Sequence, residues 1–548
     1  MLTADPTADL ERSLVEWRRF RERLRISEIH WIDALYSAYL TALFGLIAVG
    51  VAAGYIGDTA LTPAQLVQVG ADGPAWVGGV AAVAVAFGLR SGSRGGPLAL
   101  ERAEVRHVLL APVDRATALR APVLRQLRFL TFVAAVVGGI IGFLASDRFP
   151  GDTLGWSATG AIAATTALGL AYGAALVASG SRLPRWGASI AGIVLIAAWL
   201  AHAVGLAPIS PTAPFGHMVL WPLRFEPLGL VPVVVAVVIV GIGVRLLSGT
   251  SLEAAERRSS LVGQMRFAAT MQELRTVVVL RRQLSMELPR LRPWLRLRVR
   301  GSGGLPFVMR GLRGVLRWPA ARIARLVLLT VVTGLALRGV WAGTTALIVL
   351  AGLAMFVAGL DAVEPLAQEI DHPSRRDSSP RAAADIHLRH LVVGAVVMVV
   401  ASVLVAVVAS VPGPGALPFD VAAALVASIA LAGLGGAVIS VLGGEVNLAG
   451  NWMTTPPEAQ GMRIAFRTAW PPGVAVLGAA PVLLARAAVD RGAEALPGAA
   501  PGVIGIVVLF GAIALWVRVR DQVASSLKAS FEQASAQRTT PVSEDGRS

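Results

Sequence analysis

Two closely spaced histidines are the candidates for a metal site in this sequence, and a single lysine is the candidate for a phosphate-binding loop. His387 and His390 are three positions apart, so both imidazoles would lie on one face of a helix. Asp385 is the nearest third ligand, and this set falls short of the clusters that hold zinc. The sequence has no cysteine and no His-Glu-x-x-His motif. We therefore predict no catalytic residues, no metal site, no cofactor and no enzymatic activity.

The lysine content excludes the phosphate-binding loop of ATPases. That loop has the form Gly-x-x-x-x-Gly-Lys-Ser/Thr, in which the lysine reaches the terminal phosphates of the nucleotide. The only lysine here is Lys528, which follows a leucine. If ATP drives this protein, another polypeptide must therefore hydrolyse it.

A pattern of proline and arginine occurs twice in the chain. In each copy the proline is followed by arginine at +3 and +8, leucine at +15 and arginine at +16. Both copies lie in polar segments between the second and third hydrophobic stretches of a set of six. The residues singled out are Pro112, Asp114, Arg115, Arg120 and Arg128 in the first copy and Pro373, Arg376, Arg381 and Arg389 in the second. Their shared position indicates a duplicated unit.

The first copy has an amphipathic pattern. Leu119, Val123 and Leu127 recur at helical spacing among arginines. This pattern predicts a short helix that lies along the membrane surface and enters the next span through Leu127 and Arg128. Such a helix, joined rigidly to a span, would transmit a push from a soluble partner. The alternative is that these arginines only set the topology and bind anionic lipid.

The composition is typical of a polytopic helical membrane protein. Of the 548 residues 55% are hydrophobic and only 15% charged, against about 25% charged in soluble proteins. The mean hydropathy is +0.66. The net charge of +15 comes from arginines clustered in alternate loops, which is the pattern of the positive-inside rule. We therefore attribute the basic charge to topology and predict no nucleic-acid partner.

The hydrophobic stretches predict an all-α polytopic membrane protein of about 12 transmembrane helices, arranged as two pseudo-repeated six-helix bundles. The predicted spans are 31–56, 75–90, 129–146, 156–179, 187–206 and 228–246, then 322–340, 342–360, 391–411, 418–443, 468–486 and 500–518. Their centres carry glycines that favour close helix packing, among them Gly138, Gly139, Gly142, Gly433, Gly435 and Gly436. The charges lie at span ends, and no mid-membrane carboxylate stands out.

The arginine-rich loops predict the plasma membrane as location, with both termini cytoplasmic. The predicted segments are a basic amphipathic cytoplasmic helix (1–30), the first bundle (31–246), an Arg-rich cytoplasmic connector (247–321), the second bundle (322–518) and a cytoplasmic tail (519–548). Within the connector, a second basic helix is predicted from Met309 to Arg325, leading into the seventh span.

The loop from Glu104 to Arg115 resembles one found in a known transporter family. It contains Leu109-Leu110-Ala111-Pro112-Val113-Asp114-Arg115. This is similar to the cytoplasmic loop of type-2 ABC exporter permeases, in which a Leu-Leu pair precedes Pro-x-Ser/Asp-Arg after the second span. The second copy, from Glu369 to Arg376, keeps only part of the motif. The connector segment from Arg266 to Arg275 also looks like segments of actinobacterial permeases.

The resemblance implies a permease subunit formed by two fused six-span units. ATP would be hydrolysed by a separate ABC ATPase subunit, in two copies, and the motion transmitted through loops 101–128 and 361–389. Membrane lipids would be the other partner. Two alternatives remain open: a twelve-span secondary transporter, favoured by a buried acidic residue at the interface of the halves, and a non-transporting membrane scaffold.

Overall fold

The computed structural model describes residues 60–98, 100, 114–251, 256–261, 290–296, 305–371, 378–413, 415–442 and 469–539, with isolated positions elsewhere. Every regular element in these ranges is a helix. The chain divides into two compact units, Met1–Met271 with Thr276–Met286 and Gln272–Arg275 with Glu287–Ser548. Each unit is described by itself.

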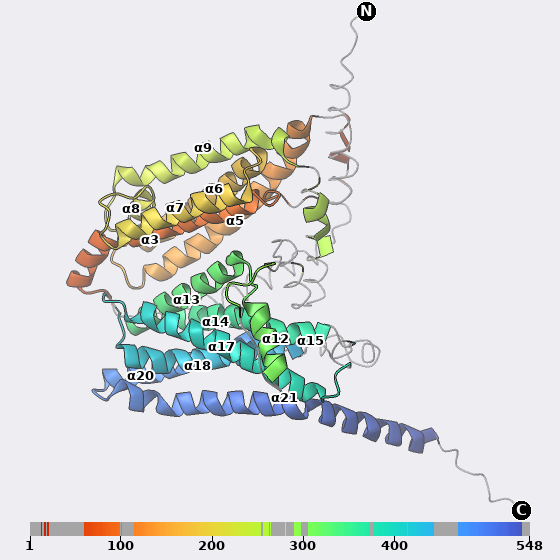
Figure 1. The fold of residues 1–548 in the computed structure, drawn as a ribbon. Helices are drawn as coiled ribbons and strands as arrows, with labels where there is room; N and C mark the ends of the chain where they lie inside the picture. Colours follow the sequence, from red (N-terminus) through yellow and green to blue (C-terminus); the bar gives the residue numbers. More distant parts are fainter. Residues whose placement is uncertain are drawn as a thin grey trace, which may run out of the picture. The chain divides into compact units, whose positions relative to one another are not determined.

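In unit 1, long helices lie side by side around α6 (Figure 1). The elements are α3 (Pro63–Gly92), α5 (Arg115–Ala145), α6 (Thr153–Gly180), α7 (Arg185–Ala203), α8 (Ala213–Val219), η1 (Pro227–Leu230), α9 (Val231–Arg245) and η2 (Leu246–Gly249). Polar caps fix where they start. Thr62 and Gln65 form a reciprocal capping box on α3, and the Asp152 carboxylate accepts the backbone N–H of Gly155 at the start of α6.

Glycines bring the backbones of α5 and α6 into contact. A Cβ atom on Gly138 would lie 2.3 Å from the carbonyl oxygen of Gly160, and one on Gly160 would lie 2.2 Å from that of Gly138. A Cβ on Gly142 would lie 2.1 Å from the carbonyl oxygen of Trp156. Only glycine permits such an approach. The close packing predicted for Gly138 and Gly142 is therefore confirmed. A Cβ on Gly139 would lie 3.7 Å from the carbonyl oxygen of Ser157, an ordinary contact distance that leaves room for a methyl group.

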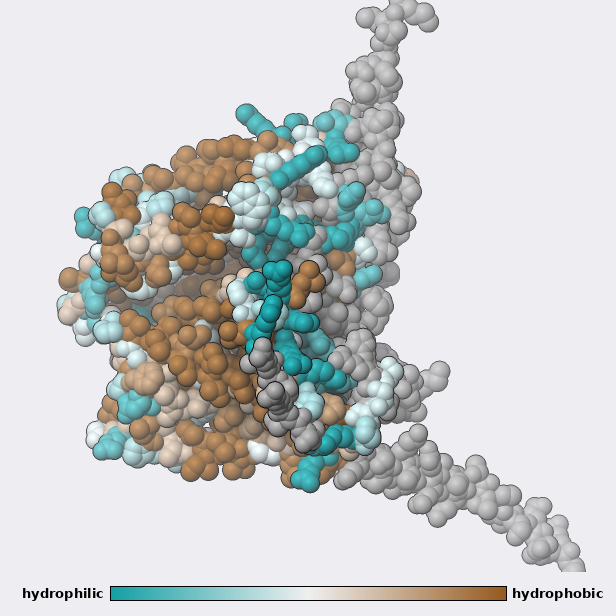
Figure 2. Space-filling model, viewed as in Figure 1, coloured by the Kyte–Doolittle hydropathy of each residue, from teal (hydrophilic) through white to brown (hydrophobic). Residues whose placement is uncertain are grey.

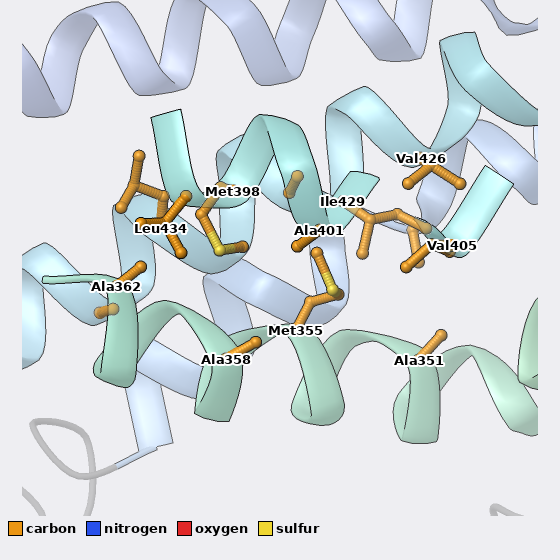
Figure 3. Packing of buried hydrophobic residues seen from close by; sticks show 14 of the residues in the cluster. Ala351, Met355, Ala358, Ala362, Met398, Ala401, Val405, Val426, Ile429 and Leu434 are labelled. Atoms are coloured by element: carbon orange, nitrogen blue, oxygen red, sulfur yellow. The ribbon is translucent and has the colours of Figure 1, made fainter. Parts of the chain in front are cut away.

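Unit 2 is built around α18, the most deeply buried of the long helices. Its elements include α12 (Leu305–Val315), α13 (Ala320–Trp341), α14 (Leu347–Ala362), α15 (Glu364–Asp371), α17 (Ala383–Ser410), α18 (Phe419–Leu442), α20 (Ala480–Asp490) and α21 (Ala495–Thr539). Residues 469–477 are also helical and form one candidate span with α20, Ala469–Asp490. Met355, Met398, Ile429 and Leu434 extend into the space between α14, α17 and α18 (Figure 3). Flexible methionine side chains suit such an irregular space between helices.

Ten helices in the described residues are long and apolar enough to cross a membrane. The pair α14 and α15, bent by 55°, brings the number to eleven if it counts as one span. The predicted span 31–56 lies outside the described residues, and each of the other predicted spans overlaps one of these helices or the bent pair.

Hydrophobic residues cover the sides of the long helices and hydrophilic residues gather towards their ends, around α12 in unit 2 (Figure 2). The segment 1–30 lies largely outside the described residues.

The single helix predicted from Met309 to Arg325 is wrong. Two helices occupy this stretch, because α12 ends at Val315 and α13 begins only after Pro319, its N-cap residue. Proline has no N–H to continue a helix. Trp318 is buried in the break, and its carbonyl oxygen accepts the indole N–H of Trp294 at 2.9 Å. The turn between α12 and α13 is thus a packed element.

The glycine contact makes a testable prediction for unit 1. We expect Gly138→Ala to lower the melting temperature of the detergent-purified protein, because the added methyl group must push α5 and α6 apart, at a cost of about 1–3 kcal/mol. Gly139→Ala is the matched control on the next residue, and its effect should stay within about 0.5 kcal/mol. Equal effects of the two substitutions on thermal unfolding would contradict the helix contact.

Candidate functional site

The first copy of the repeated pattern forms the start of α5. The Asp114 carboxylate accepts the backbone N–H of Thr117 at 3.0 Å and its hydroxyl at 3.2 Å. The bond from the Thr117 backbone, aided by the charge of Arg120, lowers the pKa of Asp114 below its ordinary value. Asp114 therefore caps the helix as a carboxylate at neutral pH, and the first turn is held in place. Pro112 lies outside the described residues.

The predicted surface helix is instead the first half of a continuous helix. From Arg115 to Ala145 the chain forms one helix that includes Pro122. Leu119 and Val123 are buried in unit 1 against Tyr172 and Leu176 of α6 and against Leu247 of η2. The apolar face thus packs on the protein, and the short helix expected here is wrong in its extent, because the segment belongs to one helix that runs on to Ala145. Its place along the membrane surface stays a prediction. Helices α6 and η2 offer that face a partner, which no sequence pattern specifies.

Outside this apolar stripe, the same segment carries four arginines that are exposed. Its exposed arginines are Arg115, Arg120, Arg125 and Arg128. The segment therefore packs its apolar stripe on unit 1 and presents guanidinium groups over the rest of its surface, where they are suited to carboxylates and phosphates. Because the segment is the first part of a candidate span, a partner that pushes on its arginines would move that span directly.

The second copy is arranged differently at the start of α17. Asp385 accepts a hydrogen bond from Arg381 Nη1 and one from Arg389 Nε, both at 3.1 Å. The equivalent position in the first copy is Leu124, so the first copy lacks this carboxylate. Pro373 and Arg376 lie outside the described residues. Arg381 and Arg389 of the second copy are therefore partly neutralised by a carboxylate that the first copy lacks at this position.

A set of buried ion pairs, not predicted from the sequence, lies at the same end of unit 2. Arg325 of α13 donates two hydrogen bonds, of 2.8 and 2.7 Å, to the carboxylate of Asp361 at the end of α14. Arg322 lies 3.6 Å from Glu364 of α15, and Arg310 of α12 pairs with Glu369. Asp361 and Glu369 are only 4% and 2% exposed. These pairs join α12, α13, α14 and α15.

The two histidines considered as a metal pair lie beside these ion pairs. Both His387 and His390 are buried on α17. His390 Nε2 lies 3.7 Å from a Glu369 oxygen and 3.4 Å from Arg310 Nη2. Among the described residues, no group of three or more acidic or histidine side chains is placed to hold a metal ion. His390 therefore contacts the ion pair formed by Arg310 and Glu369.

The sequence contains one feature from which these ion pairs could have been predicted. Arg322 and Arg325 are three positions apart, so they lie on the same face at the start of a predicted span. Two arginines on an apolar span need acidic partners from neighbouring helices, because isolated buried charges are costly. The identity of those partners depends on which helices pack together, so it followed only from the tertiary structure.

No protein-family model, curated protein or solved structure matches this chain. The helices themselves define its class: it is an all-helical, multi-pass membrane protein.

The pair of Arg325 and Asp361 makes a prediction about stability. We expect Asp361→Ala to destabilise the protein by about 3–5 kcal/mol, because the guanidinium stays in a largely buried site without this carboxylate. The double variant Arg325→Met/Asp361→Leu removes both charges and should recover much of the loss. Thermal unfolding of the purified variants measures both effects. A double variant no more stable than Asp361→Ala would contradict a direct pair.

The cap of α5 makes a second prediction. Asp114→Ala should lower stability by about 1 kcal/mol, and Asp114→Asn should lose less because an amide oxygen still accepts the Thr117 N–H. Since the folded-state pKa of Asp114 is lowered, its advantage over asparagine is present above the ordinary aspartate pKa and disappears as pH falls through the folded value. Thermal unfolding compared at neutral and strongly acidic pH tests this. An undiminished advantage in acid would refute the cap as a carboxylate.

Proposed function

We propose that this chain is the transmembrane permease subunit of an ATP-driven, ABC-type exporter, whose ATP is hydrolysed by a separate subunit in two copies. The observation that carries the proposal is the first half of α5. It presents four exposed arginines, packs its apolar stripe on unit 1, and continues without a break into an apolar helix. The absence of a lysine suited to a phosphate-binding loop agrees with a separate motor.

The proposed coupling follows from the stiffness of this segment. Closure of the two ATPase subunits would push on loops 101–128 and 361–389. In unit 1, Asp114 fixes the first turn of α5 and Leu119 and Val123 hold it against α6, so displacement passes along the helix without bending at the start. The glycine contact at Gly138 and Gly160 would carry that displacement to α6. Movement of the two six-span units would then open a path by alternating access.

The proposal includes the orientation of the chain. The arginine-rich ends would face the cytoplasm, with both termini on that side of the plasma membrane. There Arg125 and Arg128, which precede the exposed Phe129 and Phe132, would lie at the headgroups of membrane lipids.

A secondary transporter is the second candidate, because Asp361 and Glu369 are buried carboxylates. Proton- or sodium-coupled transporters use such groups to bind the coupling ion. However, Asp361 is held by two hydrogen bonds from Arg325 and lies at a helix end, and Glu369 is paired with Arg310. These arginines already supply the positive charge that a coupling ion would bring, so the ATP-driven exporter is the better-supported proposal.

Charge reversal on α5 tests the coupling. We expect Arg115→Glu/Arg120→Glu to reduce co-purification of the ATPase subunit by at least about tenfold, because reversed charges at a contact with acidic or phosphate groups repel. Arg224→Glu is the control, since Arg224 is also exposed but lies on a predicted outside loop. A thermal-unfolding curve like that of the unmodified protein shows that the fold is intact. Unchanged assembly and unchanged ATP-driven export in the double variant would refute the assignment.

A further inference from the structure

Helix α12 is attached to unit 2 across the start of α17 (Figure 1). Gly311 is its point of closest approach: a Cβ there would lie 2.8 Å from Val393 Cγ2 and 3.2 Å from His390 Nδ1. Val393 and His390 are 0% and 1% exposed. The helix therefore covers both side chains, and they would meet water if it moved away.

A charged side chain also holds α12 in place. Arg310 of α12 hydrogen-bonds to Glu369 of α15, and His390 of α17 is close to both. The three side chains differ in burial. That of Arg310 is 39% exposed, whereas those of Glu369 and His390 are 3% and 1% exposed. Arg310 is thus able to turn out into water, and the other two are enclosed by the helices that carry them.

The ion pairs described at this end of unit 2 carry equal numbers of positive and negative charges. The basic groups facing it are Arg310, Arg322 and Arg325, the acidic groups are Asp361, Glu364 and Glu369, and His387 lies on α17 one turn before His390. On the same helix, Asp385 is engaged by Arg381 and Arg389. A proton taken up by His390 adds a positive charge to a buried site in which Arg310 already pairs with Glu369, and this is costly.

We infer that Glu369 and His390 form a proton-binding site that controls the attachment of α12. The proton comes from water and binds to the imidazole. Protonated His390 then competes with Arg310 for the Glu369 carboxylate, and Arg310 is the partner that can leave for water. Its departure offsets the added charge and removes a hydrogen bond that holds α12. Because the protonated imidazole takes the place of Arg310 beside Glu369, acidification favours detachment.

A single thiol reports on this movement. The chain has no cysteine, so Val393→Cys places the only thiol beneath Gly311. The rate of labelling by a charged maleimide is measured on the full-length protein at about pH 7.5 and about pH 5.5, on either side of the histidine range. Each rate is divided by that of Leu291→Cys, a fully accessible position, because thiol reactivity itself depends on pH. We expect the ratio to rise at least about tenfold in acid, the effect of losing one hydrogen bond to a charged group.

Further substitutions in the Val393→Cys background separate the roles of His390, Glu369 and Arg310. His390→Gln should abolish the rise, and Glu369→Gln and Arg310→Gln should give fast labelling at both pH values. His217→Gln is the control, because His217 forms another histidine–carboxylate pair, with Glu226 in unit 1 at 2.7 Å, and should leave the rise intact.

An equal ratio at the two pH values would overturn the inference. So would a rise that persists in His390→Gln. If that variant does not fold, Arg310→Gln decides, because slow labelling at both pH values would show that Arg310 does not hold α12. None of these measurements involves an ATPase, so their outcome is independent of the proposed function.

Discussion

Direct backbone contact between helices is the constraint on which unit 1 depends. Inside a bilayer the lipid tails are as apolar as leucine, so burial of apolar side chains gives little drive for helices to associate. Dispersion contacts and close approach must supply it. The Gly138–Gly160 crossing of α5 and α6 does so, because neither residue has a side chain to separate the backbones. This contact holds the second half of α5 against α6, while Leu119 and Val123 hold its first half, and the proposed coupling uses both attachments.

Unit 2 uses glycine contacts as well, for example Gly436 against the backbone of Pro471, but adds a second means of holding helices together. At one end, ion pairs between arginines and carboxylates connect α12, α13, α14 and α15. Buried ion pairs contribute little net stability, but they strongly penalise any arrangement that separates the partners. They therefore specify how these helix ends fit together. The same property makes the end of the unit sensitive to an added proton.

The two copies of the repeated pattern have different electrostatic roles in the structure. On α5 the arginines are exposed, and Asp114 acts as a helix cap. On α17 two arginines engage Asp385, and the neighbouring ion pairs add further charge. If the pattern reflects duplication, the first copy has kept a free basic face and the second has become part of an internal cluster. This difference suggests that the proposed partner contacts the two copies unequally.

The sequence by itself determined the class of this protein. Apolar stretches of about 20 residues are long enough to cross the hydrocarbon core, and a segment that crosses it as a helix satisfies its own backbone hydrogen bonds. The spans predicted within the described residues were found for this reason, and the packing role of Gly138 and Gly142 followed from their place in span centres. The number of related bundles, the side on which the termini lie and the function remain predictions.

The tertiary structure alone decided where the polar and amphipathic faces point. A stripe such as Leu119 and Val123 fits a membrane surface and a neighbouring helix equally well, and only the position of α6 selects the second. In the same way, the partners of Arg322, Arg325 and His390 come from helices distant in sequence. Periodicity records which residues share a face of one helix, whereas the partner of that face depends on how all the helices pack together.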